Sequence, residues 1–159
     1  MDEAVIKYYR RLLKEEFPNS GPLANPTIFI EAVGEKLINC GNTGNYMQLF
    51  IQIEEDCIKA ITYLCSCEPV ANVAVEVLCN LMRGKRLAEA ERLGEEPFYD
   101  FLGSRDEPYS KKVVGVLELF KEGITSYYAQ GDHQETPFRS DKTPGSKLSW
   151  DAALSTGPS

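Results

Sequence analysis

The chain has 159 residues, which is the size of one domain with room for a polar end. Its 17 basic and 24 acidic side chains give a net charge of −7, so nucleic acid is excluded as the expected partner because its phosphates would be repelled. No run approaches the roughly 20 apolar residues that a bilayer span needs. The acidic start, MDEAVIKYYRRLLKEEF, lacks the apolar stretch of a signal peptide, and we therefore expect a cytoplasmic protein without a membrane segment.

The first half of the chain predicts one helix followed by three strands. Apolar residues at helical spacing indicate an amphipathic helix over residues 3–16, which ends at the turn residues that follow Pro18. Three apolar runs come next and are typical of strands: residues 27–33, 46–54 and 58–64. Residues 54–56 (Glu-Glu-Asp) indicate a hairpin turn between the last two strands, although they lack the Asn-Gly or Asp-Gly signature.

The second half predicts helices. A continuous apolar stripe with three- and four-residue steps runs from Val70 to Met82, which indicates a core helix that stops at Gly84. A shorter helix is expected over residues 87–93. Residues 95–108 contain Pro97, Gly103 and Pro108 and are expected to form a loop, and the last helix is expected over residues 111–128.

This order of elements predicts an α+β protein with a small antiparallel three-stranded sheet packed against helices. We expect a folded domain over residues 1–128 and a disordered polar tail over residues 129–159. The tail is rich in Ser, Thr, Pro, Gly and charge, so it cannot bury enough apolar area to offset the entropy of ordering it.

The cysteines are the residues that most suggest chemistry. There are five, an odd number in an expected reducing compartment, so they are metal ligands, reactive thiols or core filler rather than a disulfide framework: Cys40, Cys57, Cys65, Cys67 and Cys79. Cys65 and Cys67 end the third strand just before a helix, where the helix dipole favours a thiolate, although both also suit a buried structural role.

The predicted hairpin brings the start of its first strand close to the end of its second strand. Cys40 lies in a Gly- and Asn-rich loop before the first of these strands, so it can approach Cys67. Cys57 is at the opposite, turn end, and Cys79 is inside the apolar helical stripe, so both are expected to be structural.

The rest of the sequence contains no recognisable catalytic motif. The single histidine, His133, has no neighbouring acid or nucleophile and falls in the expected tail. The sequence has no phosphate-binding glycine loop, no HExxH and no GxSxG. The largest basic cluster, Arg83, Lys85 and Arg86, is expected to be a solvated helix end. We therefore expect a protein that is not an enzyme.

Three segments together resemble a known family. TGNYMQLFIQIEE, AITYLCSC and RGKRLAEA are similar in kind and order to the U-type iron–sulfur cluster scaffolds, IscU and the N-terminal domain of NifU. The resemblance implies a SufE/NifU-like fold, transient binding of iron or a [2Fe–2S] cluster with zinc as another possible metal, and a cysteine desulfurase and a chaperone as partners. It also allows a homodimer.

The family's ligand pattern is only partly kept. Counting from the shared segments, the first family cysteine falls on Thr43, the neighbouring aspartate on Asn45, the second cysteine on Cys67 and the third near Val114. The resemblance therefore implies a reduced cofactor-binding set of Cys40, Cys65 and Cys67, with Cys40 and Cys67 as metal ligands.

Three functions follow from this reduced set. The first is a divergent scaffold that binds iron or a labile cluster. The second is a sulfur acceptor similar to SufE, in which Cys40 carries a persulfide. The third is a partner-binding protein that has kept the fold and lost the cluster chemistry.

Overall fold

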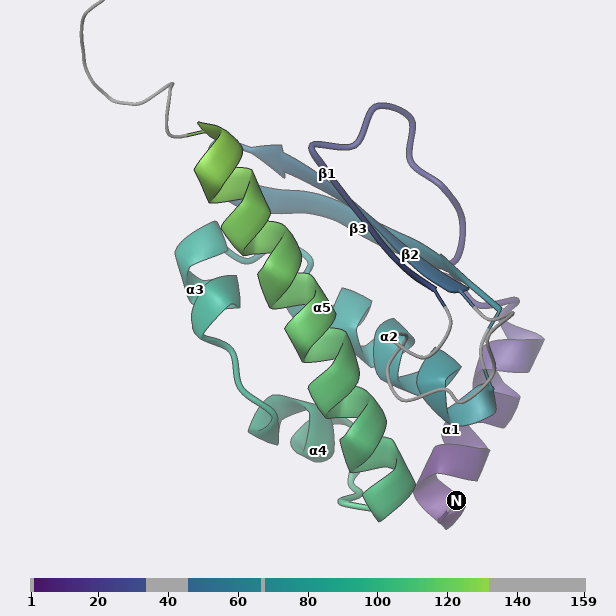
Figure 1. Ribbon diagram of the computed structural model, residues 1–159. Helices are drawn as coiled ribbons and strands as arrows, with labels where there is room; N and C mark the ends of the chain where they lie inside the picture. Colours follow the sequence, from purple (N-terminus) through teal and green to yellow (C-terminus); the bar gives the residue numbers. More distant parts are fainter. Residues whose placement is uncertain (1, 34–45, 67, 132–159) are drawn as a thin grey trace, which may run out of the picture. The chain divides into compact units, whose positions relative to one another are not determined.

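The structure is a computed structural model that describes residues 2–33, 46–66 and 68–131 (Figure 1). It divides into two compact units, residues 1–123 and 124–159, and the boundary falls within the last helix. The second unit is described only as far as residue 131. The elements are α1 (Glu3–Lys14), β1 (Ile28–Val33), β2 (Tyr46–Glu54), β3 (Cys57–Cys65), α2 (Pro69–Met82), α3 (Leu87–Arg92), α4 (Glu96–Leu102) and α5 (Glu107–Gly131).

The three strands form one antiparallel sheet in the order β1-β2-β3, as predicted. Pairs such as Ile28 with Ile51 and Ile51 with Ile61 set the register across the sheet. The two residues that join β2 to β3, Glu55 and Asp56, have φ angles of 52° and 62°. Two left-handed residues are what a tight two-residue hairpin turn requires, and here the turn is made without glycine.

One face of the sheet carries the core. Side chains alternate along each strand, so the inner residues of β2 and β3 recur at every second position. They are fully buried or nearly so: Met47, Leu49, Ile51, Ile61 and Tyr63. Helix α2 packs on β3, and α1 and α4 pack on α2. The predicted fold class is therefore confirmed.

Helix α2 is the central element of this core. Ten of its 14 residues are buried, and it ends as predicted at Gly84, whose φ of 85° suits a glycine after a helix. Cys79 lies in the buried stripe, which confirms the expectation that it is structural. Burial raises the pKa of the Cys79 thiol, with the charge of Glu76 as the second cause, and this disfavours the thiolate.

The prediction of a loop over residues 95–108 is wrong. Helix α4 occupies seven of these residues, with Pro97 in its first turn and Gly103 at its end with a φ of 76°. Proline costs nothing in a first turn because its missing N–H would have no intrahelical partner there. Pro108 is likewise in the first turn of α5, so that helix begins at Glu107 rather than at residue 111.

The end of α5 reaches three residues into the predicted tail, to Gly131, and residues 132–159, including His133, lie outside the described residues. The domain boundary near residue 128 and the disorder of the tail remain predictions. Within the described ranges, the helices include none with both the length and the apolarity to cross a bilayer.

Candidate functional site at the end of the hairpin

The start of β2 and the end of β3 lie together, as the sequence predicted. They form the open end of the β2–β3 hairpin, which we call the hairpin end. Met47 pairs with Cys65 in the sheet register. One residue further on, Ser66 donates its backbone N–H to the carbonyl of Tyr46 at 3.0 Å, and its hydroxyl accepts from the Tyr46 N–H at 3.0 Å. These two bonds hold the chain at the point where it leaves β3 for α2.

Cys65 is the described cysteine at this end of the hairpin. It lies opposite the buried Met47, and alternation along β3 places it on the same inner face as Ile61 and Tyr63. Its thiol is free and half-buried, whereas Cys79 in α2 is fully buried. Of the described cysteines, Cys65 is therefore the one that lies at this end of the hairpin and is not fully buried.

The other two predicted site residues, Cys40 and Cys67, lie outside the described residues, and so do Thr43 and Asn45. Their approach to each other therefore stays a prediction. Cys57 is half-buried at the opposite, turn end of β3, where the sequence analysis placed it. Its backbone forms an isolated antiparallel β-bridge with the backbone of Arg86. A structural role for Cys57 also stays a prediction.

An ion pair stands beside the hairpin end, and the sequence analysis missed it. Lys112 in the second turn of α5 places its Nζ 2.7 Å from Oε1 of Glu68, the residue that precedes α2. Lys112 is buried although it is charged. Its spacing of four residues from the buried Val116 was the available signal, because the two residues share one face of a helix.

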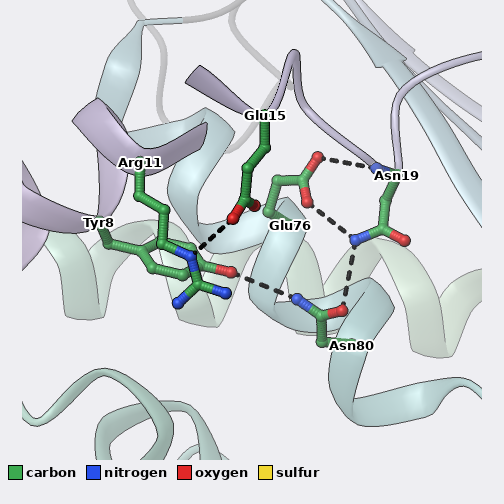
Figure 2. A network of polar contacts seen from close by, with 6 residues as sticks. All are labelled: Tyr8, Arg11, Glu15, Asn19, Glu76 and Asn80. Carbon is green, nitrogen blue, oxygen red and sulfur yellow. Dashed lines mark hydrogen bonds and ion pairs between the residues drawn. The ribbon is translucent and has the colours of Figure 1, made fainter. Parts of the chain in front are cut away.

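A second polar cluster lies deeper, around Glu76 in the middle of α2 (Figure 2). Glu76 is fully buried, and its carboxylate accepts from the Asn19 backbone N–H at 3.2 Å and from the Asn19 side-chain amide at 2.8 Å. It also accepts from the Tyr63 hydroxyl at 2.9 Å. Burial raises the pKa of Tyr63, and the nearby charge of Glu76 raises it further, so Tyr63 remains a hydrogen-bond donor.

The Glu76 cluster fixes the segment between α1 and β1. The backbone of Asn19 accepts from the Tyr63 N–H at 3.2 Å, and the Gly21 N–H donates to the Tyr63 carbonyl at 2.8 Å, which pairs this segment with the edge of β3. Figure 2 shows the cluster continuing through Asn80 to Tyr8 of α1. These contacts are structural, and they cover an edge that would otherwise expose unpaired backbone groups.

The Glu76 cluster also involves the predicted basic patch. Arg83 is exposed, as expected for a solvated helix end, but its guanidinium also donates to the side-chain oxygen of Asn19 and, at 3.5 Å, to that of Asn80. Arg83 therefore helps to fasten the Asn19 segment to the end of α2.

Donor groups at the hairpin end are few in the described part of the chain. No three His, Cys, Asp or Glu side chains among the described residues are grouped so that they could hold a metal ion. Cys65 supplies one thiol, and the nearby carboxylate of Glu68 is already paired with Lys112. An iron centre usually takes four thiolate-type ligands, so the described residues alone do not complete one.

Comparison with solved structures finds proteins with a similar fold. The chain is similar to a protein described as a candidate iron–sulfur cluster assembly scaffold for the SUF system of the thermophile Fervidobacterium islandicum AW-1, with a TM-score of 0.58 and 15% identity over 78% of this chain and 96% of that one. It is also similar to the N-terminal part of a NifU-like protein from Brucella abortus, with a TM-score of 0.57 and 11% identity over 81% of this chain and 94% of that one.

At this level of identity the comparisons establish the fold. The predicted resemblance to the U-type scaffolds is confirmed as a shared architecture, a SufU/NifU-like domain of α+β class. No protein-family model matches the sequence, and no curated protein matches it either.

Proposed function

We propose that this protein is a divergent iron–sulfur scaffold that binds iron or a labile cluster at the end of the β2–β3 hairpin. The observation that carries the proposal is the free, partly exposed Cys65 at a strand end, in a fold shared with a structure described as a cluster-assembly scaffold and with a NifU-like domain. The proposed cargo ligands are Cys65, Cys67 and Cys40. In this role the protein holds cargo and is not an enzyme.

The chemistry of the cysteines supports this choice of ligands. Thiolates are the usual ligands of iron in clusters, and zinc accepts the same donors. Three cysteines from one chain leave an iron site short of its usual four, so we propose that the cargo is held loosely or is bridged between two copies of the chain. By analogy with the fold, a cysteine desulfurase is the proposed sulfur donor and a chaperone the proposed release factor.

Anaerobic reconstitution with iron and sulfide tests the proposal. We expect visible thiolate-to-iron charge-transfer absorption in the wild type and its loss in Cys65→Ser and Cys67→Ser. Cys57→Ser is the matched control, because Cys57 is also half-buried but lies at the opposite end of β3. Absence of the absorption in the wild type, or its survival unchanged in both strand-end variants, contradicts the proposal.

The Glu68–Lys112 ion pair favours a second candidate, a partner-binding protein that has lost cluster chemistry. The pair joins the segment after Cys67 to the segment before Val114, the two places where the family resemblance puts the second and third cysteines. An ion pair there can hold the two segments together without a metal. Equal iron content in the wild type and in a variant with all five cysteines changed to serine supports this candidate instead.

A further inference from the structure

The sheet has two outer edges, and the described residues cover only one of them. Along the β3 edge, Tyr63 exchanges backbone hydrogen bonds with residues 19–21, and Ile58 does so with residues 84–85. Strand β1 forms the other edge, and β2 is its neighbour in the sheet. Within the described part of the chain, no backbone hydrogen bond outside the β1–β2 ladder reaches β1, so its outer edge is open there.

Alternation along an antiparallel ladder shows which backbone groups lie on this open edge. Tyr63 uses its N–H and C=O on the outer side of β3, so its cross-strand partner Leu49 turns its own groups toward β1. Ile30, the partner of Leu49 on β1, turns its groups back toward β2. The neighbouring residues Phe29 and Glu31 therefore direct their N–H and C=O groups away from the sheet, as an added strand requires.

An aromatic side chain lies beside the open edge. Phe29 is 52% exposed on the outer face of the sheet, and its ring centroid lies 5.4 Å from that of Phe50, its partner on β2. The inner face of β1 is closed, because a Cβ atom on Gly123 of α5 would collide with the side chain of Ile30. The accessible part of β1 is therefore its edge together with the outer face around Phe29.

We propose that two copies of this chain pair through β1, antiparallel and two-fold, and so join their sheets into one. Centred on Phe29, this pairing sets the ring opposite the same ring of the second copy and matches the outward backbone groups of both strands. Glu31, the charged residue of β1, then lies opposite Thr27 rather than opposite a second carboxylate. The Thr27 hydroxyl accepts from the Ile53 N–H at 2.9 Å, which leaves its own hydrogen to donate to Glu31.

The pairing closes at two copies. A two-fold contact uses the same edge of both copies, and the β3 edge is already covered at Tyr63 and Ile58. Val33 at the end of β1 is paired with Tyr46 at the hairpin end. Because the two β1 strands run in opposite directions, the two hairpin ends lie at opposite ends of the seam. The dimer therefore does not bridge cargo between them, and it does not depend on the proposed function.

Sedimentation equilibrium of the full chain tests the dimer, under reducing conditions so that disulfides cannot join two copies. We expect the wild type to be a dimer in equilibrium with the monomer. Phe29→Lys removes the aromatic pair and places two like charges opposite each other, so we expect the dimer dissociation constant to rise at least about tenfold. Phe101→Lys is the matched control, because Phe101 is 44% exposed on α4, and it should leave the dissociation constant unchanged.

Two further variants test the backbone pairing and its register. Phe29→Pro removes an N–H that the ladder with β2 does not use, so the monomer keeps its sheet while the dimer loses a hydrogen bond at its centre. We expect this variant to unfold cooperatively on heating, as a folded protein does, and to be a monomer where the wild type is a dimer. Glu31→Gln should leave the dissociation constant nearly unchanged, because the two carboxylates do not face each other.

The outcomes decide each part of the proposal. A wild type that stays monomeric at every concentration overturns it, and so does a dimer that both Phe29→Lys and Phe29→Pro leave unchanged or that Phe101→Lys weakens equally. A dimer that is tightened by Glu31→Gln overturns the register, and assemblies larger than two copies overturn the two-fold closure. These measurements contain no iron or zinc, so the absence of a dimer leaves the proposed function standing, and failed cluster reconstitution leaves the dimer standing.

Discussion

The two glutamates of the α2 region, Glu68 at its N-cap and Glu76 at its middle, are in opposite situations. Glu76 is fully buried and accepts three hydrogen bonds from Asn19 and Tyr63. Glu68 is half-exposed and paired with a buried lysine. The same side chain is therefore enclosed by donors at one place and half open to solvent at the other.

The difference lies in how completely each carboxylate is satisfied. A buried carboxylate is stable only when donors surround it, as they surround Glu76. An exposed carboxylate can exchange its partner at low cost because water replaces the lost contact. We expect substitutions at Glu76 to lower stability more than substitutions at the Glu68–Lys112 pair.

The largest effect is expected for Glu76→Gln. All three groups that face this carboxylate are donors, so an amide there turns an N–H toward another donor and leaves buried groups unsatisfied. We expect a loss of about 2–4 kcal/mol in the free energy of unfolding, measured by urea denaturation.

Glu118→Gln is the matched control, because Glu118 is exposed on α5 and the same change there should cost less than about 0.5 kcal/mol. A loss below about 1 kcal/mol in Glu76→Gln would mean that the cluster does not fasten the segment around Asn19. Zinc affinity should be the same in Glu76→Gln as in the wild type at temperatures where both are folded.

Local sequence patterns predict some elements of this fold and miss others. The strand over residues 46–54 has the bounds that were predicted, because alternation along a strand is a local pattern. Helix α4 was missed because Pro97 and Gly103 punctuate loops and helix ends alike, and only the folded chain shows which applies.

The candidate site is harder to predict than the fold. The meeting of the two strand ends followed from hairpin geometry, and Cys65 is indeed at that place. Glu76 and Lys112 were not predicted because each is a polar residue on a helix whose partner lies far away in the chain. Asn19 is 57 residues from Glu76, so the residue spacing within one helix or strand cannot predict their contact.

The next effect in size is expected for Tyr63→Phe, which removes one donor to Glu76. A hydrogen bond to a charged group contributes about 1.5–3 kcal/mol, and we expect a loss of that order at pH 7. The pKa of Tyr63 is raised above its ordinary value of about 10, first by burial and then by Glu76, so the folded protein keeps a proton that the unfolded chain releases.

The sign of the pH dependence follows. Stability from Tyr63 is fully present below pH 10 and declines as the pH rises above it, by up to about 1.4 kcal/mol per pH unit. Tyr63→Phe should therefore unfold with a shallower alkaline decline than the wild type. Equal slopes above pH 10 in urea denaturation would show that Tyr63 ionises in the folded protein.

The smallest effects on stability are expected at the Glu68–Lys112 pair, and they should be unequal. Glu68→Gln leaves an enclosed ammonium without its carboxylate, and we expect a loss of about 1–2 kcal/mol, less than for a fully buried pair because half of Glu68 is open to water. Lys112→Met leaves an exposed carboxylate that water can solvate and puts an apolar side chain in a buried position, so its change should stay within about 1 kcal/mol.

Urea denaturation of both single variants and of the double variant measures this asymmetry. If Lys112→Met is the more destabilising of the two, the ammonium is better solvated than its 7% exposure indicates, and the pair is then a structural contact like those of Glu76. If Glu68→Gln is more destabilising and the double variant recovers most of its loss, the cost arises from the buried charge of Lys112. That result is what the unequal exposure of the two side chains requires, because a 7% exposed ammonium gains less solvation than a 49% exposed carboxylate when the pair is broken.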